Sequence, residues 1–511
     1  MDFFKKLFSH RVAFIFLPMI LQLVFLVAVI ERFNEYFVFF YGGSVFLSLI
    51  AVLWIINNKD NPAYKIAWII PILLFPIFGG LFYLIFGGNK LSRRIKQKMK
   101  FITEKTRVVL APQEDILNEI RLQDEGAYNQ SRYIQSYGLY PPMCNTETEY
   151  LPSGELKFVR LLEELSKAKR YIFLEYFIIK EGYMWNSILD ILAEKASQGV
   201  DVRVIYDDAG CLFTLPSGYN KQLEQMGIKC CIFNPLVPLL SPRLNNRDHR
   251  KIAVIDGRVG FTGGINLADE YINKVKKYGH WKDTAIMLKG EAVWSLTVMF
   301  LTMWGYLRSV EENFNDFKVD YSNEQEWISQ GYVQPFADSP LDDEPVGETV
   351  YLNLINKAKR YVYITTPYLI IDNEIERALT SAAKAGVDVR IITPHIPDKW
   401  YVNLVSKSFY KNLVECGVKI YEYTPGFMHA KTIVVDDEYA VVGTINLDYR
   451  SLFALFECGV WMYMTESVKA VKKDFLDTLN VCTQITNDDF KNIKWYQTLA
   501  GSVLRIFSPL M

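Results

Sequence analysis

Two stretches of the chain each place a histidine and a lysine two residues apart, with an aspartate five residues further on. Alternate residues of a β-strand point to the same face, so each histidine–lysine pair can act on one target. A doubled pair suits a phosphodiester: one histidine attacks phosphorus, the other protonates the leaving oxygen, and the lysines hold the non-bridging oxygens. The candidate catalytic residues are His249, Lys251 and Asp256 in the first copy and His429, Lys431 and Asp436 in the second.

Each motif is predicted to form a β-hairpin. Asp256-Gly257 lies between two apolar runs, which is a strong signal for a two-residue turn, and Asp436-Asp437 repeats it more weakly. With such a turn, Lys251 pairs opposite Thr262, and the returning strand carries Asn266 back beside His249.

The motif aspartate and a downstream asparagine complete each copy. Asp256 follows Lys251 by five residues, about 16 Å along a strand, which is too far to share one phosphate. We therefore interpret Asp256 as a structural anchor of the turn. A Gly-x-x-Asn sequence follows each motif at the same distance, and its asparagines, Asn266 and Asn446, are supporting site residues.

Other repeats show that the duplication extends beyond the motifs. Lys167-Ala-Lys-Arg-Tyr171 recurs at 357–361, and Gly199-Val-Asp-Val-Arg203 recurs at 386–390. Strands that alternate with helices predict an α/β layered sheet in each half. One half-site per copy predicts a pseudo-twofold axis that brings the motifs together. The expected helices are 158–167, 185–197, 350–357 and 374–385, and the expected strands before each hairpin are 171–179, 200–206, 361–370 and 387–393.

The predicted fold is therefore two tandem α/β/α domains preceded by an N-terminal transmembrane region. Three apolar runs, 12–30, 36–56 and 66–86, are each long enough to span a bilayer, and the first is too long for a signal peptide. The expected segments are a membrane region 1–88, a basic juxtamembrane connector 89–150, a first domain 151–312, an acidic linker 313–347, a second domain 348–490 and an apolar tail 491–511.

Basic residues suggest how the membrane region is oriented. Lys5, Lys6 and Arg11 precede the first run, and six basic residues follow the third within 90–100. Positive clusters favour the cytoplasm, so the third run either turns back at its Pro71, Pro76 and Gly79-Gly80 breaks or crosses fully with the N-terminus outside. Both schemes leave the catalytic halves in the cytoplasm, with the second basic cluster near anionic headgroups. The tail from Trp495 is typical of either an interfacial anchor or a packed core segment.

Composition excludes several classes of protein. Lysine plus arginine number 56 against 57 for aspartate plus glutamate, so the chain lacks the basic field of a nucleic-acid enzyme. Its seven cysteines have no C-x-x-C spacing, which indicates reduced thiols in a cytosolic setting. No carboxylate-rich metal motif is evident, and His280 and His395 look like structural or surface residues. We expect neither a metal nor a cofactor.

Paired H-x-K-x4-D motifs with a downstream glycine and asparagine resemble the phospholipase D superfamily, and within it the bacterial cardiolipin synthases. The resemblance covers nearly the whole chain from about Asn61. One small departure is Gly443-Thr444, where the family more often has Gly-Ser. The matching segments are Glu175-Tyr-Phe-Ile-Ile179, Tyr206-Asp-Asp-Ala-Gly210, Asn246-Arg-Asp-His-Arg-Lys251, Gly263-Gly-Ile-Asn-Leu-Ala-Asp-Glu-Tyr271, Asn446-Leu-Asp-Tyr-Arg-Ser451 and Phe507-Ser-Pro-Leu-Met511.

The resemblance implies that phosphatidylglycerol and anionic membrane lipids are the partners. One phosphatidylglycerol would lose glycerol and leave its phosphatidyl group covalently on a histidine, and a second would attack to give cardiolipin. His249 would be the nucleophile and His429 the acid and base. Asp283 and Glu457 match the acids that orient the family's histidines.

Four alternatives remain open at this point. A hydrolytic phospholipase D shares every motif and differs only in admitting water. A phosphatidyltransferase with another donor, such as phosphatidylethanolamine, shares them too. A phosphodiester nuclease is disfavoured by the neutral charge and the apolar runs. A non-enzymatic membrane scaffold predicts an eroded motif, and neither copy is eroded.

Overall fold

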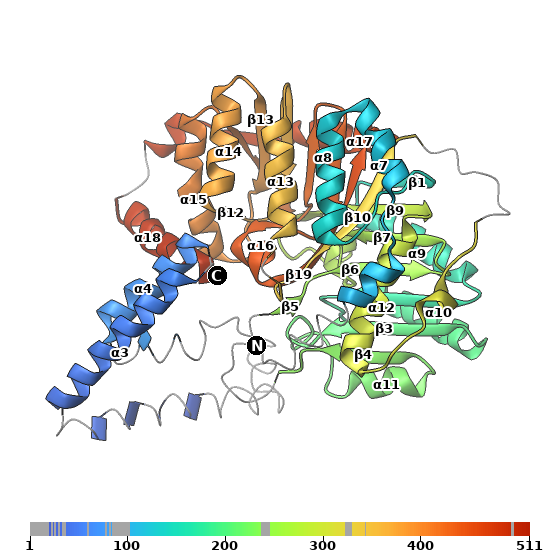
Figure 1. The fold of residues 1–511 in the computed structure, drawn as a ribbon, viewed down its shortest axis with the longest axis horizontal. Coiled ribbons are helices and arrows are strands. Elements are labelled where there is room, and N and C mark those ends of the chain that lie inside the picture. Colours follow the sequence, from blue (N-terminus) through green and yellow to red (C-terminus); the bar gives the residue numbers. More distant parts are fainter. Residues whose placement is uncertain are drawn as a thin grey trace.

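The computed structural model describes residues 103–236, 246–321, 330–342, 344–491 and 495–510, together with 37–58, 61–76 and single positions between 20 and 83. Two sheet-based halves make up most of the described chain, one above the other in Figure 1. The predicted mixed α/β architecture with two similar halves is confirmed.

The first half is built on a seven-stranded sheet. Its strands, in spatial order, are β1 (Thr146–Leu151), β9 (Ala285–Gly290), β7 (Val259–Gly263), β6 (Lys251–Ile255), β2 (Tyr171–Tyr176), β3 (Asp201–Asp207) and β4 (Lys229–Phe233). Strands β2, β3 and β4 run parallel, and the others continue the sheet antiparallel. The helices of this half are α9 (Gly154–Lys167), α10 (Tyr183–Ser197), α11 (Tyr219–Gln225) and α12 (Val293–Arg308).

The second half repeats the same strand order. Its path is β10 (Tyr332–Asp338), β19 (Leu455–Tyr463), β17 (Tyr439–Gly443), β16 (Thr432–Val435), β11 (Tyr361–Thr365), β13 (Asp388–Pro394), β14 (Lys419–Tyr423) and β20 (Cys482–Ile485). Its helices are α13 (Val346–Lys357), α14 (Asn373–Lys384), α15 (Trp400–Glu415), α16 (Tyr449–Phe453) and α17 (Glu466–Leu479). The identical order of the first seven strands is what an internal duplication predicts.

The apolar runs form central strands because both faces of each sheet are covered. Every residue of β2 and of β19 is buried, as expected for strands between two layers. One hydrophobic core joins the inner face of the first sheet, through Phe173 and α12, to the second half; another lies under α9 and α10. The strand predicted at 361–370 is divided into β11 and β12 (Leu369–Ile370), because Pro367 lacks the N–H that a continuous ladder needs.

The segments predicted as connector and linker each supply an edge strand. Strand β1 starts within 89–150, ends one residue beyond it and pairs with β9, while β10 lies within 313–347 and pairs with β19. An antiparallel bridge between Met143 and Val333 connects the chain just before β1 to β10. Both strands mix polar with apolar residues, so composition alone did not reveal them. The two segments are therefore part of the folded sheets and contact each other, and they do not act as linkers alone.

The N-terminal helices lie outside the two sheets. The predicted run 36–56 is helix α3 (Phe37–Asn57), and the start of 66–86 is helix α4 (Pro62–Leu74), which ends before Pro76. Among the described residues, no helix combines the length and apolar character of a membrane-crossing segment. Both basic clusters lie outside the described residues, and only isolated positions of the run 12–30 are described. The transmembrane arrangement therefore stays a prediction.

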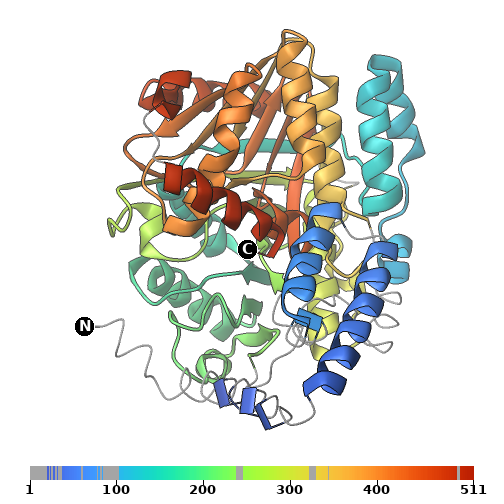
Figure 2. The ribbon, with the colours of Figure 1, turned by 90° about the vertical axis from the view of Figure 1, so that its left-hand side faces the viewer.

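The C-terminal helix α18 (Trp495–Ile506) packs on the second half beside α4 (Figure 2). Arg505 donates to Glu376 at 2.8 Å and lies 4.0 Å from the centre of the Phe409 ring on α15. Trp495 remains 77% exposed. One face of the tail therefore packs as a core segment, and its other face is open.

Candidate active site

The turns of both motif hairpins are one residue longer than predicted. Ile255 pairs with Val259, so the loop is Asp256-Gly257-Arg258, and Ile252, not Lys251, lies opposite Thr262. The predicted two-residue turn is wrong for this reason, and the second hairpin has the same three-residue loop. Asp256 and Gly257 have φ of 54° and 70°, the left-handed conformation that such loops require.

The motif aspartates hold backbone, not substrate. The Asp256 carboxylate accepts hydrogen bonds from the N–H groups of Lys169, Arg170 and Tyr171 at 2.7–2.9 Å. Asp436 does the same for residues 359–361 at 2.7–2.9 Å. These contacts agree with the structural interpretation of Asp256, and the same interpretation extends to Asp436. The repeated Lys-Ala-Lys-Arg-Tyr sequence supplies the N–H groups that these aspartates bind.

Replacing Asp436 with alanine should therefore destabilise the protein without removing its chemistry. Three charge-assisted bonds would be lost and three N–H groups left unpaired, which should cost about 2–4 kcal/mol of unfolding free energy. Thermal unfolding and specific activity of the folded fraction measure the two effects separately, with exposed Asp477→Ala as the control. A normal melting temperature combined with lost turnover would instead identify Asp436 as catalytic.

Each motif histidine is positioned by the opposite half. Strand β5 (Arg247–Asp248) pairs with β19, and the N–H of His249 donates to the Phe456 carbonyl at 2.9 Å. Reciprocally, β15 (Gly426–Met428) pairs with β8 (His280–Lys282), and the N–H of His429 donates to the Lys282 carbonyl at 2.7 Å. The residue that follows each acceptor is a buried acid.

These two acids orient the histidines crosswise. Nδ1 of His249 lies 2.8 Å from Oε1 of Glu457, and Nδ1 of His429 lies 2.6 Å from Oδ2 of Asp283. Both acids were predicted, and the structure assigns each to the histidine of the other half. Glu457 also accepts hydrogen bonds from Ser451, at 2.7 Å, and from the Thr444 hydroxyl. Thr444, at the position where the family more often has serine, therefore still provides a hydroxyl that donates to Glu457.

Burial lowers the pKa of each histidine and lysine in the site, and repulsion from the neighbouring bases adds to this effect at His249, His429 and Lys431. Burial, together with Lys251, holds the pKa of His249 well below 6.5, and burial, together with Lys431, lowers the pKa of His429 to about 4. Burial also lowers the pKa of Lys251 to about 8 and that of Lys431 to about 7. Each lysine Nζ donates to the carbonyl of its own motif histidine. Such a cluster of buried bases strongly favours the arrival of a phosphodiester anion.

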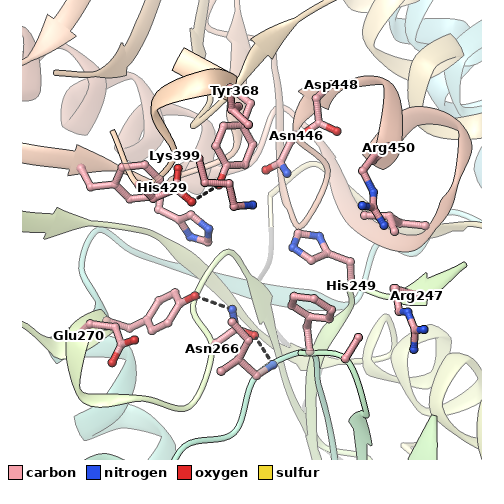
Figure 3. Close-up of a pocket in the computed structure, with 18 of the residues that line it drawn as sticks. Arg247, His249, Asn266, Glu270, Tyr368, Lys399, His429, Asn446, Asp448 and Arg450 are labelled. Atoms are coloured by element: carbon pink, nitrogen blue, oxygen red, sulfur yellow. Dashed lines mark hydrogen bonds between the residues drawn. The ribbon is translucent and has the colours of Figure 1, made fainter. Parts of the chain in front are cut away.

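Both histidines face one cavity of about 680 Å³ (Figure 3). This volume is in the range of pockets that enclose small-molecule groups. Its aromatic lining consists of Phe177, Tyr271, Tyr278, Trp281, Tyr368 and Phe427.

The two predicted asparagines also line this cavity. Asn266 accepts from the Ile178 N–H at 3.0 Å and donates to the Tyr271 hydroxyl at 2.7 Å. The side-chain oxygen of Asn446 is buried and has no hydrogen-bond partner among the described residues. It is therefore an acceptor that a bound hydroxyl could satisfy.

Seven charged residues that line the cavity were not predicted as site residues. They are Arg247, Glu270, Lys277, Asp398, Lys399, Asp448 and Arg450. An alignment of the two copies would have singled out Glu270 and Arg450, because each lies four residues after the motif asparagine.

In the described part of the chain, the other histidines, the cysteines and a group of three carboxylates are the remaining residues that could bind a metal, and none of them lines the cavity. His395 contacts Glu422 at 2.9 Å, and His280 contacts the Tyr423 hydroxyl at 2.9 Å. All seven cysteines are free thiols, as expected. The fold does gather three carboxylates, from Glu348, Asp372 and Glu374, within 4.8 Å of one another. The sequence analysis missed this group because its members belong to two elements, and none of them lines the cavity.

Comparison with known proteins gives concordant results. A family model described as the PLD-like domain of cardiolipin synthase matches residues 161–304 and 351–479, and a phospholipase D–nuclease N-terminal model matches 46–88. A cardiolipin synthase of Geobacillus kaustophilus is 38% identical over 91% of this chain and 92% of its own length. An uncharacterized protein of Streptococcus mutans serotype c is 45% identical over 90% of this chain and 99% of its own.

A solved structure supports the fold. The crystal structure of phosphatidylserine synthase from Haemophilus influenzae Rd KW20 superposes with a TM-score of 0.57 at 14% identity. It covers 75% of this chain and 97% of that chain. The likeness extends to the arrangement of both halves.

Proposed function

Because the chain belongs to the cardiolipin synthase family of phospholipase D-like proteins, we propose that it condenses two phosphatidylglycerol molecules into cardiolipin and glycerol. The chain is a phospholipid phosphatidyltransferase, and phosphatidylglycerol is the donor and acceptor that we propose for it. One observation carries the proposal: two histidines from different halves face one cavity, and each is oriented by an acid from the opposite half.

The proposed reaction has two balanced steps. In the first, Nε2 of His249 attacks phosphorus, the bond to the glycerol oxygen breaks, and His429 gives that oxygen a proton. In the second, a hydroxyl of another phosphatidylglycerol gives its proton to His429 and attacks phosphorus, which frees His249. One phosphodiester is exchanged for another, so no nucleotide is consumed, and a covalent intermediate divides the displacement into two easier steps.

The electrostatics support His249 as the nucleophile. Burial raises the pKa of its partner Glu457 to about 8, so this acid carries less negative charge to stabilise a protonated His249. Burial lowers the pKa of His429, but its partner Asp283 acts in the opposite direction and raises it. A bound phosphodiester anion would raise it further, so His429 is the better proton donor. Lys251 and Lys431 supply the positive charge that metal ions provide in other phosphoryl-transfer enzymes.

We further propose attachment to the cell membrane through the N-terminal region, with the catalytic halves facing the cytoplasm. The N-terminal family match at 46–88 covers the second part of the second apolar run and the whole of the third. A lipid-transferring cavity must receive its substrates from a bilayer, which supports this placement.

A product assay tests the function. Purified full-length protein in detergent micelles, given phosphatidylglycerol alone in the presence of EDTA, should form cardiolipin and glycerol in equal amounts. Mass spectrometry of the lipids and an enzymatic glycerol assay measure both products, and His249→Ala is the blank. Phosphatidic acid as the main product would identify a hydrolase. Activity that appears only with phosphatidylethanolamine would change the donor, and activity that requires an added divalent ion would overturn the metal-free mechanism.

A further inference from the structure

We propose that Glu270 binds the hydroxyls of the polyol headgroup at the His429 end of the cavity, whereas Arg247 and Arg450 hold the phosphatidyl group at the His249 end. The inference rests on the function proposed above and deepens it, because it names the residue that selects a polyol as leaving group and as acceptor.

The two half-sites differ in charge at equivalent positions. Gly263–Tyr271 aligns without gaps with 443–451, and both segments carry asparagine at the fourth position. Four residues later the first copy has Glu270 and the second has Arg450. Two residues before the motif histidines, the first copy has Arg247 and the second has Phe427. All four of these side chains line the cavity. At these two pairs of positions, the first copy supplies Glu270 and Arg247, and the second supplies Arg450 and an uncharged phenylalanine.

The close-up view places these charges at opposite ends. In Figure 3, Arg247 and Arg450 lie on the side of His249, whereas Glu270 and Lys399 lie on the side of His429. Glu270 reaches the cavity from a 3₁₀ turn at Asp269–Ile272, which follows directly on the segment that holds Asn266. It is 6% exposed.

Glu270 has acceptor capacity to spare. Its Oε2 accepts from Lys180 at 3.2 Å, and Lys277 lies 3.6 Å from Oε1, beyond hydrogen-bond distance. Two lysines therefore lie beside this carboxylate, and a carboxylate offers about four acceptor positions. The vicinal hydroxyls of a glycerol group are suitable hydrogen-bond donors to the acceptor positions of Glu270 that the lysines leave unused. An amine headgroup would instead bring a cation close to Lys180 and Lys277.

The surrounding wall suits a small polyol. The Trp281 ring centre lies 4.7 Å from that of Tyr271, 4.8 Å from that of Phe427 and 5.2 Å from that of His429. Aromatic faces pack against C–H groups, while polar side chains at the edge fix orientation. This end of the cavity therefore offers an apolar wall with a carboxylate beside it.

In-line displacement connects this end to the reaction. When His249 attacks phosphorus, the leaving oxygen lies on the opposite side, toward His429, so the departing glycerol meets Glu270. The acceptor hydroxyl enters at the same place in the second step. Its own phosphate lies one glycerol further on, and Lys277 and Lys399 are cations that line the cavity at that end. The phosphatidyl group stays on His249, beside the two arginines.

The test compares two donors with the same acyl chains, phosphatidylglycerol and phosphatidyl-p-nitrophenol, whose leaving group has no vicinal hydroxyls. Glu270→Gln should lower the ratio of kcat/KM for phosphatidylglycerol over the nitrophenyl donor at least about tenfold, since a buried carboxylate–hydroxyl contact is lost. Both donors are measured on one preparation, so any misfolded fraction cancels from the ratio.

Arg450→Gln is the matched control at the equivalent position. It should lower kcat/KM for both donors together and leave their ratio within about twofold, because both donors share the phosphatidyl group. An unchanged ratio in Glu270→Gln, or an equal shift in Arg450→Gln, would overturn the inference. Wild-type protein that forms no cardiolipin from phosphatidylglycerol would instead refute the proposed function itself, so the two failures are distinguishable.

Discussion

Replacing His249 or His429 with alanine is expected to lower the rate of cardiolipin formation by about 10³-fold or more. Each histidine forms or breaks a bond in both proposed steps, and loss of a nucleophile or its proton-transfer partner typically has an effect of this size or larger. Initial rates from phosphatidylglycerol measure the loss. His395→Ala is the control, because His395 pairs with Glu422 and does not line the cavity; it should keep wild-type turnover.

The two variants should differ in the intermediate they form. Nitrophenol leaves without a proton, so His429→Ala should still be phosphatidylated by phosphatidyl-p-nitrophenol, but without a base for the second step it should release the group slowly. An acid-labile, base-stable adduct is expected on the peptide containing His249, and His249→Ala should form none. Labelled lipid on the His429 peptide of the wild-type enzyme would reverse the assigned roles.

Neutralising the crossed acids should produce the second-largest loss. Glu457→Gln and Asp283→Asn each remove a carboxylate from Nδ1 of a catalytic histidine, and loss of such an orienting partner costs roughly 10²-fold or more. Turnover of phosphatidylglycerol should fall by about this factor in both variants, with melting temperatures recorded to exclude unfolding.

The nitrophenyl donor separates the two acids. Glu457→Gln should slow adduct formation from both donors, because Glu457 orients the nucleophile His249. Asp283→Asn should affect nitrophenol release far less than cardiolipin formation, because Asp283 serves the acid His429, which this leaving group does not need. If Asp283→Asn slowed nitrophenol release more strongly than Glu457→Gln, each acid would act on the histidine of its own half and the crosswise arrangement would be wrong.

The chemical groups of the site could be predicted from the sequence alone. His249, Lys251 and their second copies are recognisable because strand periodicity and motif spacing are local properties of the chain. The duplication predicted two similar halves, and repeated helices and strands fall within a few residues of their expected positions. These inferences succeed because each depends on neighbours in sequence.

What the sequence missed depends on residues that are distant along the chain. The turn at Asp256 is longer than predicted because its carboxylate binds the N–H groups at 169–171. Strands β1 and β10 form because a sheet edge is available to them, which their own composition does not signal.

The tertiary structure also decided which acid serves which histidine. Glu457 and Asp283 were predicted from the family resemblance, which did not say which histidine each acid serves; β5 and β15 each cross to pair with the opposite half. The crossing gives each histidine an acid from the other copy. It also places Glu270 and Arg450 at opposite ends of one cavity. Sequence spacing fixes the distance between residues only within a single element, whereas the packing of two halves determines the contacts between them.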